Sequence, residues 1–374
     1  MKTATTTLIL CVGSLMALGM VALYSYSIAK TGAHYLVMQG VWSGVGILVC
    51  LVAALCDYRI LKKFAVPLLI VAVLALVVVL IPGIGVFRNG SRRWLAYGFL
   101  NFQPSEVAKL ALIIALAWYG EKYQRDIRTF WRGILVPGFI SGTVLALIFL
   151  EPDRGTTILL ASVTGLMLLL AGIKWFYFIP PAVLGLTGMA YALASDPVRM
   201  KRIVGWLHPE EHKDGVGYQA WQAMIALGSG GVSGLGIGNG RQKLGFVPEN
   251  HTDFILSIVG EEMGLVATLA VVCAFVIFLI CGVYIAWHAR DVFGLLLGSG
   301  ITFLIGLQAL INIGVVTSTL PNKGLPLPFV SYGGSSLLLM LFAIGVLISI
   351  ARLGGAPGEE PETRKESFRR TQFA

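Results

Sequence analysis

Residues 253–287 read DFILSIVGEEMGLVATLAVVCAFVIFLICGVYIAW, an apolar run that opens on an aspartate and contains two adjacent glutamates. A helix needs roughly 20 apolar residues to span a bilayer, so this run is too long for a perpendicular crossing. We therefore expect its first turns to line a cavity or to stand above the bilayer. Acids are costly in an apolar segment unless they are paired or functional. Asp253, Glu261 and Glu262 thus indicate a polar site.

The rest of the chain has the same apolar character. Of its 374 residues, 56% are hydrophobic and only 13% are charged, whereas a soluble domain carries roughly 25% charged residues. Apolar runs of spanning length recur from end to end, which predicts an all-α polytopic membrane protein. The five cysteines lie within or at the edges of these runs. They lack metal-ligand spacing, so neither disulfides nor a redox role is indicated.

Polar breaks divide the apolar sequence into about ten predicted transmembrane helices. The first run is longer than the apolar region of a signal peptide and is interpreted as a span. The fourth contains Lys109, so its boundaries are the hardest to place. A large extracellular loop, 195–252, separates the seventh span from the eighth. The predicted spans lie near 7–28, 37–56, 64–82, 104–120, 133–150, 156–172, 175–194, 253–287, 293–316 and 328–351.

The distribution of Lys and Arg predicts the orientation in the membrane. An even number of spans places both termini on one side. With the termini inside, the internal segments carry most of the Lys and Arg residues found outside the long loop, as the positive-inside rule requires. Both termini are therefore predicted to be cytoplasmic. The net charge of +9 follows mainly from this bias and does not indicate a nucleic-acid partner.

The predicted organisation is one transmembrane domain, 1–352, followed by a disordered cytoplasmic tail, 353–374, which is rich in Gly, Pro and charge. Within the long loop, YQAWQAMIAL (218–227) has large apolar residues at helical spacing and predicts an amphipathic helix at the membrane interface. The following SGGVSGLGIGNG (229–240) is not preceded by a strand, so a dinucleotide site is disfavoured. A flexible loop that approaches a ligand is the better interpretation.

Further polar residues concentrate in the predicted external segments. In QPSE (103–106), Pro104 and Glu106 are typical of a helix start. Lys109 lies three residues after Glu106, hence on the same helix face. This pair is either a functional site or a device that fixes helix packing. The turn EPDRG (151–155) is either functional or simply solvated.

The loop LPNKGLPLPFVSYGGSSL (320–337) is stiffened by three prolines, and Lys323 is its only cation. Asp253 has a structural interpretation as a cap of the eighth helix, because an aspartate there interacts favourably with the helix dipole. Capping does not explain Glu261 and Glu262, which each need a partner. The available cations predict one external polar cavity shared by several spans. These cations are Arg92 or Arg93, Lys109, Arg154, Lys243 and Lys323.

These motifs resemble the SEDS family, the cell-wall polymerases and division proteins typified by RodA and FtsW. The resemblance runs in order from about residue 89 to 336 and rests on QPSE, EPDRGTT, GYQ, GSGG, PENHTDFI, GEE and PNKGLPLPFVSYGGSSL. The sequences NKG (322–324) and QKL (242–244) are more similar to FtsW and its sporulation relative than to RodA. The sequence does not distinguish a role in division from one in elongation or sporulation.

The resemblance implies a peptidoglycan glycosyltransferase that polymerises lipid II at the outer face of the cytoplasmic membrane. Asp253 matches the family's catalytic aspartate and is expected to be the general base. Cations are needed to hold the leaving diphosphate or to orient the substrate, and the remaining acids are expected to position them. The candidate cations are Arg93, Lys109, Arg154, Lys243 and Lys323, and the candidate positioning acids are Glu106 and Glu261.

No resident metal is predicted, since the chain has no Asp-x-Asp pair. Either the cations replace a metal or a divalent cation arrives with the substrate diphosphate. The resemblance also implies a class B penicillin-binding protein, a transpeptidase, as partner, together with other divisome or elongasome membrane proteins. Two alternatives stay open, a lipid II flippase and a non-catalytic division scaffold. A flippase needs a polar path to the cytoplasmic side, and a scaffold does not need polar spans.

Overall fold

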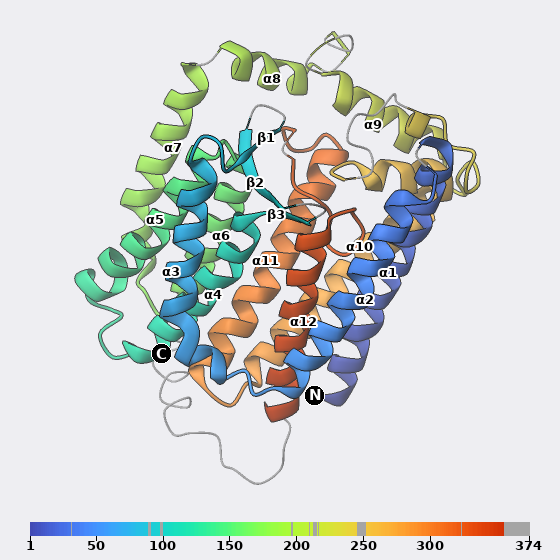
Figure 1. Cartoon of the computed structure of the whole chain (residues 1–374). Helices are drawn as coiled ribbons and strands as arrows, with labels where there is room; N and C mark the ends of the chain where they lie inside the picture. Colours follow the sequence, from blue (N-terminus) through green and yellow to red (C-terminus); the bar gives the residue numbers. More distant parts are fainter. Residues whose placement is uncertain are drawn as a thin grey trace.

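The computed structural model describes residues 1–30, 32–88, 91–97, 100–195, 197–208, 210–211, 215, 217–244, 252–322 and 324–354. Each of the ten predicted spans coincides with one helix of a bundle (Figure 1). Seven of the described helices are long and apolar enough to cross a membrane. The ten helices are α1 (Lys2–Lys30), α2 (His34–Leu55), α3 (Ile60–Leu80), α4 (Pro104–Lys122), α5 (Val136–Leu150), α6 (Arg154–Leu170), α7 (Ile179–Ala194), α10 (Ile255–Trp287), α11 (Val292–Val316) and α12 (Gly334–Gly354).

The described part of the predicted long loop contains helices. It contains α8 (Pro197–Leu207), α9 (Tyr218–Ser229) and a short 3-10 turn, η3 (Gln242–Leu244). Helix α9 confirms the helix predicted at 218–227, but its buried residues are the alanines 220, 223 and 226 rather than the large apolar side chains. These small residues let α9 pack against α10. Most of the predicted tail, from residue 355 onward, lies outside the described residues.

A small antiparallel sheet, absent from the all-α prediction, lies between α3 and α4. Its strands are β1 (Val86–Arg88), β2 (Ser91–Tyr97) and β3 (Leu100–Phe102), in the order β1-β2-β3. Arg88 pairs with Ser91 across the two-residue sequence Asn-Gly, which is the strongest short signal for a hairpin. This hairpin differs from the polar loop expected for the stretch.

Helix α4 forms the centre of the bundle. It packs against α3, α5, α6, α11 and α12, and most of its residues are buried. A helix buried on all sides has no lipid face, so its sequence need not be as apolar as that of an outer helix. This explains why Lys109 lies within a span and why the boundaries of that span were hard to predict.

The π-helical turn η1 (Trp131–Leu135) and the 3-10 turn η2 (Trp175–Phe178) precede α5 and α7.

The long helix α10 is broken at Gly264, where the backbone has φ 77° and ψ −171°. A side chain at this position would collide with the backbone of Val232 and Gly234. The glycine-rich segment packs here, and Leu265 N donates to Gly231 O at 3.0 Å. The break separates a short first segment, which follows Asp253, from the longer apolar remainder. It therefore accommodates the excess length noted in the sequence.

The sheet, α8 and α9 gather at one end of the bundle, while α1 begins and α12 ends at the other (Figure 1). We call the end that carries the sheet, α8 and α9 the loop end. The starts of α4, α6 and α10 also lie there. All candidate site residues that the structure describes therefore occupy one end of the molecule.

Close helix packing gives a direct test of the fold. Gly345 of α12 faces α2, and a Cβ added there would collide with Cys50 O and lie 2.7 Å from the Cβ of Ala53. Overpacking of this kind costs about 1–3 kcal/mol, so Gly345→Ala should lower the thermal unfolding midpoint of the detergent-purified protein. Gly165→Ala on α6 is the control, since nothing lies within 4 Å of the added methyl group. An equal response of the two variants would contradict the packing of α2 against α12.

Candidate active site

Asp253 lies at the loop end, in the turn that precedes α10. The helix begins at Ile255 and its N-cap position is occupied by Phe254, so the capping role considered for Asp253 does not match the helix start. The Asp253 side chain is half-buried. Its Oδ2 would be only 2.6 Å from a Cβ added to Gly324. The absence of a side chain at position 324 thus lets this backbone lie directly against the carboxylate.

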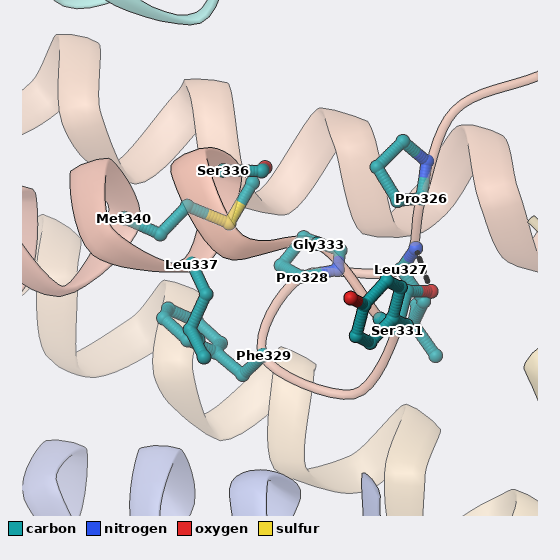
Figure 2. Close-up of a pocket in the computed structure, with 10 residues that line it drawn as sticks. Pro326, Leu327, Pro328, Phe329, Ser331, Gly333, Ser336, Leu337 and Met340 are labelled. Carbon is teal, nitrogen blue, oxygen red and sulfur yellow. Dashed lines mark hydrogen bonds between the residues drawn. The ribbon is translucent and has the colours of Figure 1, made fainter. Parts of the chain in front are cut away.

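The segment that carries Gly324, here called the proline loop (residues 320–333), is held by buried amides of α11. Gln308 Nε2 donates to Pro326 O at 2.9 Å, and Asn312 Nδ2 donates to Leu325 O at 2.7 Å. Within the loop, Leu327 N donates to Ser331 Oγ at 2.8 Å, a bond drawn in Figure 2. Figure 2 also shows a small pocket between this loop and the first turns of α12. The proline loop is therefore fixed in place.

Glu106 and Lys109 form the ion pair that their spacing predicted. Lys109 Nζ lies 2.8 Å from Glu106 Oε1 and donates at 3.2 Å to Gln308 Oε1. Lys109 is only 2% exposed, so in this structure its ammonium meets protein atoms rather than an open cavity. Gln308 also donates to the proline loop, so it connects the ion pair to that loop.

The turn between α5 and α6 forms a second cluster, with Arg93 from β2. The Arg93 guanidinium donates to Glu151 O at 3.0 Å and to Pro152 O at 2.7 Å, and lies 3.7 Å from Asp153 Oδ2. Asp153 caps α6, where its Oδ1 accepts from Thr156 N at 3.1 Å. The turn is thus a built structure rather than a solvated loop.

Glu151 is fully buried in this turn. Neither of its carboxylate oxygens has a hydrogen-bond partner among the described residues. Burial raises the pKa of the Glu151 carboxyl to about 8, and the neighbouring Asp153 adds to the effect while Arg93 opposes it. Arg154 begins α6, and its guanidinium lies 5.6 Å from the centre of the Phe149 ring. The sequence pattern of this turn does not indicate that Glu151 is buried.

A third cluster contains Lys243, Glu262 and Ser25 of α1. Lys243 Nζ lies 2.7 Å from Glu262 Oε1 and 2.7 Å from Ser25 Oγ, which itself donates to Glu262 Oε1. Glu261 accepts hydrogen bonds from the backbone N–H groups of Arg241 and Gln242. Glu261 therefore stays a predicted positioning acid, held by these backbone groups beside the cluster. Its neighbour Glu262 forms the ion pair with Lys243.

The third cluster also corrects the prediction of a flexible glycine-rich loop. Leu235 N donates to Glu261 O at 3.0 Å and Gly236 N to Glu262 O at 2.9 Å. The segment is therefore fixed against the first part of α10. The described acids and cations expected to share one cavity form three hydrogen-bonded groups at the loop end. Lys323 lies outside the described residues.

Three polar residues at the site were missed by the sequence analysis. Gln308 and Asn312 lie in the apolar run of α11, and Ser331 lies in the proline loop. Amides inside an apolar run are a recognisable functional signal, which would have identified the first two. Within the described part of the chain, no three His, Cys, Asp or Glu side chains gather to hold a metal ion.

The comparisons with known proteins agree with the geometry. The profile of the FtsW/RodA/SpoVE family, described as cell cycle proteins, matches residues 3–354. A probable peptidoglycan glycosyltransferase FtsW of Geobacter metallireducens is 39% identical over 351 residues, which cover 92% of this chain and 94% of the relative. Stage V sporulation protein E of Bacillus subtilis is 37% identical over 347 residues, covering 93% and 95%.

Two solved structures have the same fold. One comes from work on the structural coordination of polymerization and crosslinking by a peptidoglycan synthase complex, with a TM-score of 0.78 at 27% identity. The other is the rod shape determining protein RodA of Thermus thermophilus, with a TM-score of 0.71 at 28% identity. Each alignment covers 93% of this chain and 97% of the other chain. The similarity thus extends over nearly the whole molecule.

The buried Glu151 predicts a specific dependence of stability on pH. A carboxyl with a raised folded-state pKa stabilises the fold while it is protonated, and this contribution is lost as the pH rises towards the folded pKa. Between the ordinary value of 4.5 and about 8, the wild type should therefore lose stability relative to Glu151→Gln, which is neutral throughout. The measurement is the difference in unfolding midpoint between the two proteins from about pH 5 to 8.5. The exposed Glu211→Gln is the control. Parallel curves for wild type and Glu151→Gln would contradict the raised pKa of Glu151.

Proposed function

This chain belongs to the FtsW/RodA/SpoVE family, and on that premise we propose that it is a peptidoglycan glycosyltransferase that polymerises lipid II into glycan strands. The protein is a multi-pass membrane protein. Its relatives named FtsW support a role in cell division. The charge bias of the sequence supports an orientation with both termini in the cytoplasm and the loop end at the outer face of the cytoplasmic membrane.

The chemistry requires a base and a stabilised leaving group. A hydroxyl oxygen of one sugar attacks the anomeric carbon of another. The bond between that carbon and the diphosphate oxygen breaks, and the lipid diphosphate leaves with the electron pair. A carboxylate near the attacking hydroxyl takes up its proton, and cations stabilise the charge that develops on the diphosphate.

Asp253 is the base in this proposal, and its partial exposure is the observation that carries the assignment. The acids around it are buried in the protein. Asp253 alone among the six acids considered is half-buried, beside the exposed Gly324. A substrate hydroxyl can therefore reach its carboxylate without rearrangement of the bundle. The five buried acids are Glu106, Glu151, Asp153, Glu261 and Glu262.

The cations have different roles in this proposal. Arg93, Arg154 and Lys323 are the groups that hold the diphosphate. Lys109 with Glu106 positions the proline loop through Gln308. Lys243 fixes the glycine-rich segment to α10 through Glu262, and Glu261 helps through its bonds to backbone N–H groups. Among these cations, only Arg93, Arg154 and Lys323 would contact substrate.

A crosslinking partner is part of the proposal. One structural relative comes from work on a peptidoglycan synthase complex that coordinates polymerization and crosslinking. We therefore expect this chain to act with a single-span class B penicillin-binding protein. The long loop 195–252 and the helices that face lipid offer surfaces for this and for other divisome or elongasome proteins.

The variant Asp253→Asn tests the function directly. Asn is nearly isosteric with Asp but does not take up a proton at neutral pH, and loss of a general base typically costs ~10²–10⁴-fold in rate. The purified variant should therefore accumulate in the membrane and bind its partner but make almost no glycan from lipid II. Asp126→Asn is the control, because Asp126 is an exposed acid at the opposite end of the bundle, paired with Arg132. A flippase or a scaffold does not need a base at position 253, so near wild-type polymerisation by Asp253→Asn would contradict the mechanism.

A further inference from the structure

Two consecutive backbone carbonyls at the site are each bonded by a buried side chain from a different element. Ser331 Oγ of the proline loop donates to Thr252 O at 2.6 Å. Asn312 Nδ2 of α11 donates to Asp253 O at 2.7 Å. The first carbonyl belongs to the peptide before the Asp253 Cα and the second to the peptide after it. Because peptide units are planar, fixing both of them fixes the direction in which the Asp253 side chain leaves the backbone.

Each of these two side chains also holds the proline loop. Ser331 Oγ accepts from Leu327 N at 2.8 Å, and the second N–H of Asn312 donates to Leu325 O at 2.7 Å. Gly324, whose backbone lies against the Asp253 carboxylate, immediately precedes Leu325. The same two residues thus set both the carboxylate and the backbone that faces it.

We infer that Ser331 and Asn312 are positioning residues that aim the Asp253 carboxylate at the substrate hydroxyl. The inference rests on the proposed function of Asp253. Ser331 is 6% exposed and Asn312 is 1% exposed, so in this structure neither side chain is open to substrate and both act through Asp253. Displacement of a catalytic group by about 1 Å can cost ~10²-fold in rate, which makes such positioning consequential.

Any buried hydrogen bond also contributes to stability, and the chain offers a matched control for that effect. Ser349 of α12 is fully buried. Its Oγ donates to Cys56 O at 2.5 Å and accepts from Tyr58 N at 3.2 Å. Ser349 therefore makes the same two kinds of bond as Ser331, to a carbonyl and from a backbone N–H. It does so at the opposite end of the bundle, away from Asp253.

The experiment compares Ser331→Ala with Ser349→Ala in the full-length protein. Each variant removes the same atom and the same two kinds of hydrogen bond, so we expect both to lower the unfolding midpoint. Only Ser331→Ala should lower kcat for polymerisation of lipid II, by up to ~10²-fold, with KM close to the wild-type value. Ser331→Thr keeps the hydroxyl group and should recover most of the lost kcat.

Several outcomes would overturn the inference. If Ser331→Ala keeps wild-type kcat, or if the two Ala variants lose kcat equally, the serine has only a structural role. Should Ser331→Ala fail to accumulate, Asn312→Ala decides the question by the same comparison of kcat with KM. Asp253→Asn is measured alongside. An active Asp253→Asn removes the proposed function itself, whereas an inactive one with an unimpaired Ser331→Ala contradicts the positioning role alone.

Discussion

The loop end depends on the interactions of the buried Lys109 ammonium group with Glu106 and Gln308. A charge buried in a helical bundle requires partners, and Lys109 finds Glu106 on its own helix and Gln308 on α11. The requirement orients Gln308, whose amide then donates to the backbone of the proline loop. Asn312, four residues later on the same helix, bonds both that loop and the Asp253 segment. Lys109, Gln308 and Asn312 thus form contacts that reach the proline loop and the backbone of Asp253, the residue that carries the partly exposed carboxylate.

At the opposite end of the bundle, a buried charged group also has several partners. Asp291 caps α11 and accepts hydrogen bonds from Gly294 N, the Tyr58 hydroxyl, Arg59 and Lys62. Its carboxylate is 3% exposed and is committed to these partners. At the loop end, Asn312 bonds the backbone carbonyl of Asp253, and the Asp253 side chain is half-buried beside Gly324. The buried Asp291 joins helices at one end of the bundle, whereas the half-buried Asp253 is the proposed base at the other.

The sequence predicted the features that depend on local pattern. Apolar runs predicted the ten helices, and the spacing of Glu106 and Lys109 predicted the ion pair. The role of Asp253 as the base stays a prediction from the family motifs. Features that depend on tertiary packing were missed. The partners of Glu262 are Lys243 and Ser25, distant in the chain, and Glu261 is satisfied by backbone N–H groups. Neither arrangement has a periodicity that hydropathy or charge spacing can reveal. The sheet is different, since its Asn-Gly signal was present in the sequence and was overlooked in a chain dominated by helices.

In the proposed function, the ordered loop end is a site of glycan synthesis. The most direct test is to supply the purified wild-type protein with lipid II, with and without a class B penicillin-binding protein, and to analyse the products by size. We expect glycan strands that a muramidase degrades, in larger amounts when the partner is present. Lipid II that stays monomeric under both conditions, or that only moves from one leaflet of a vesicle to the other, would contradict it.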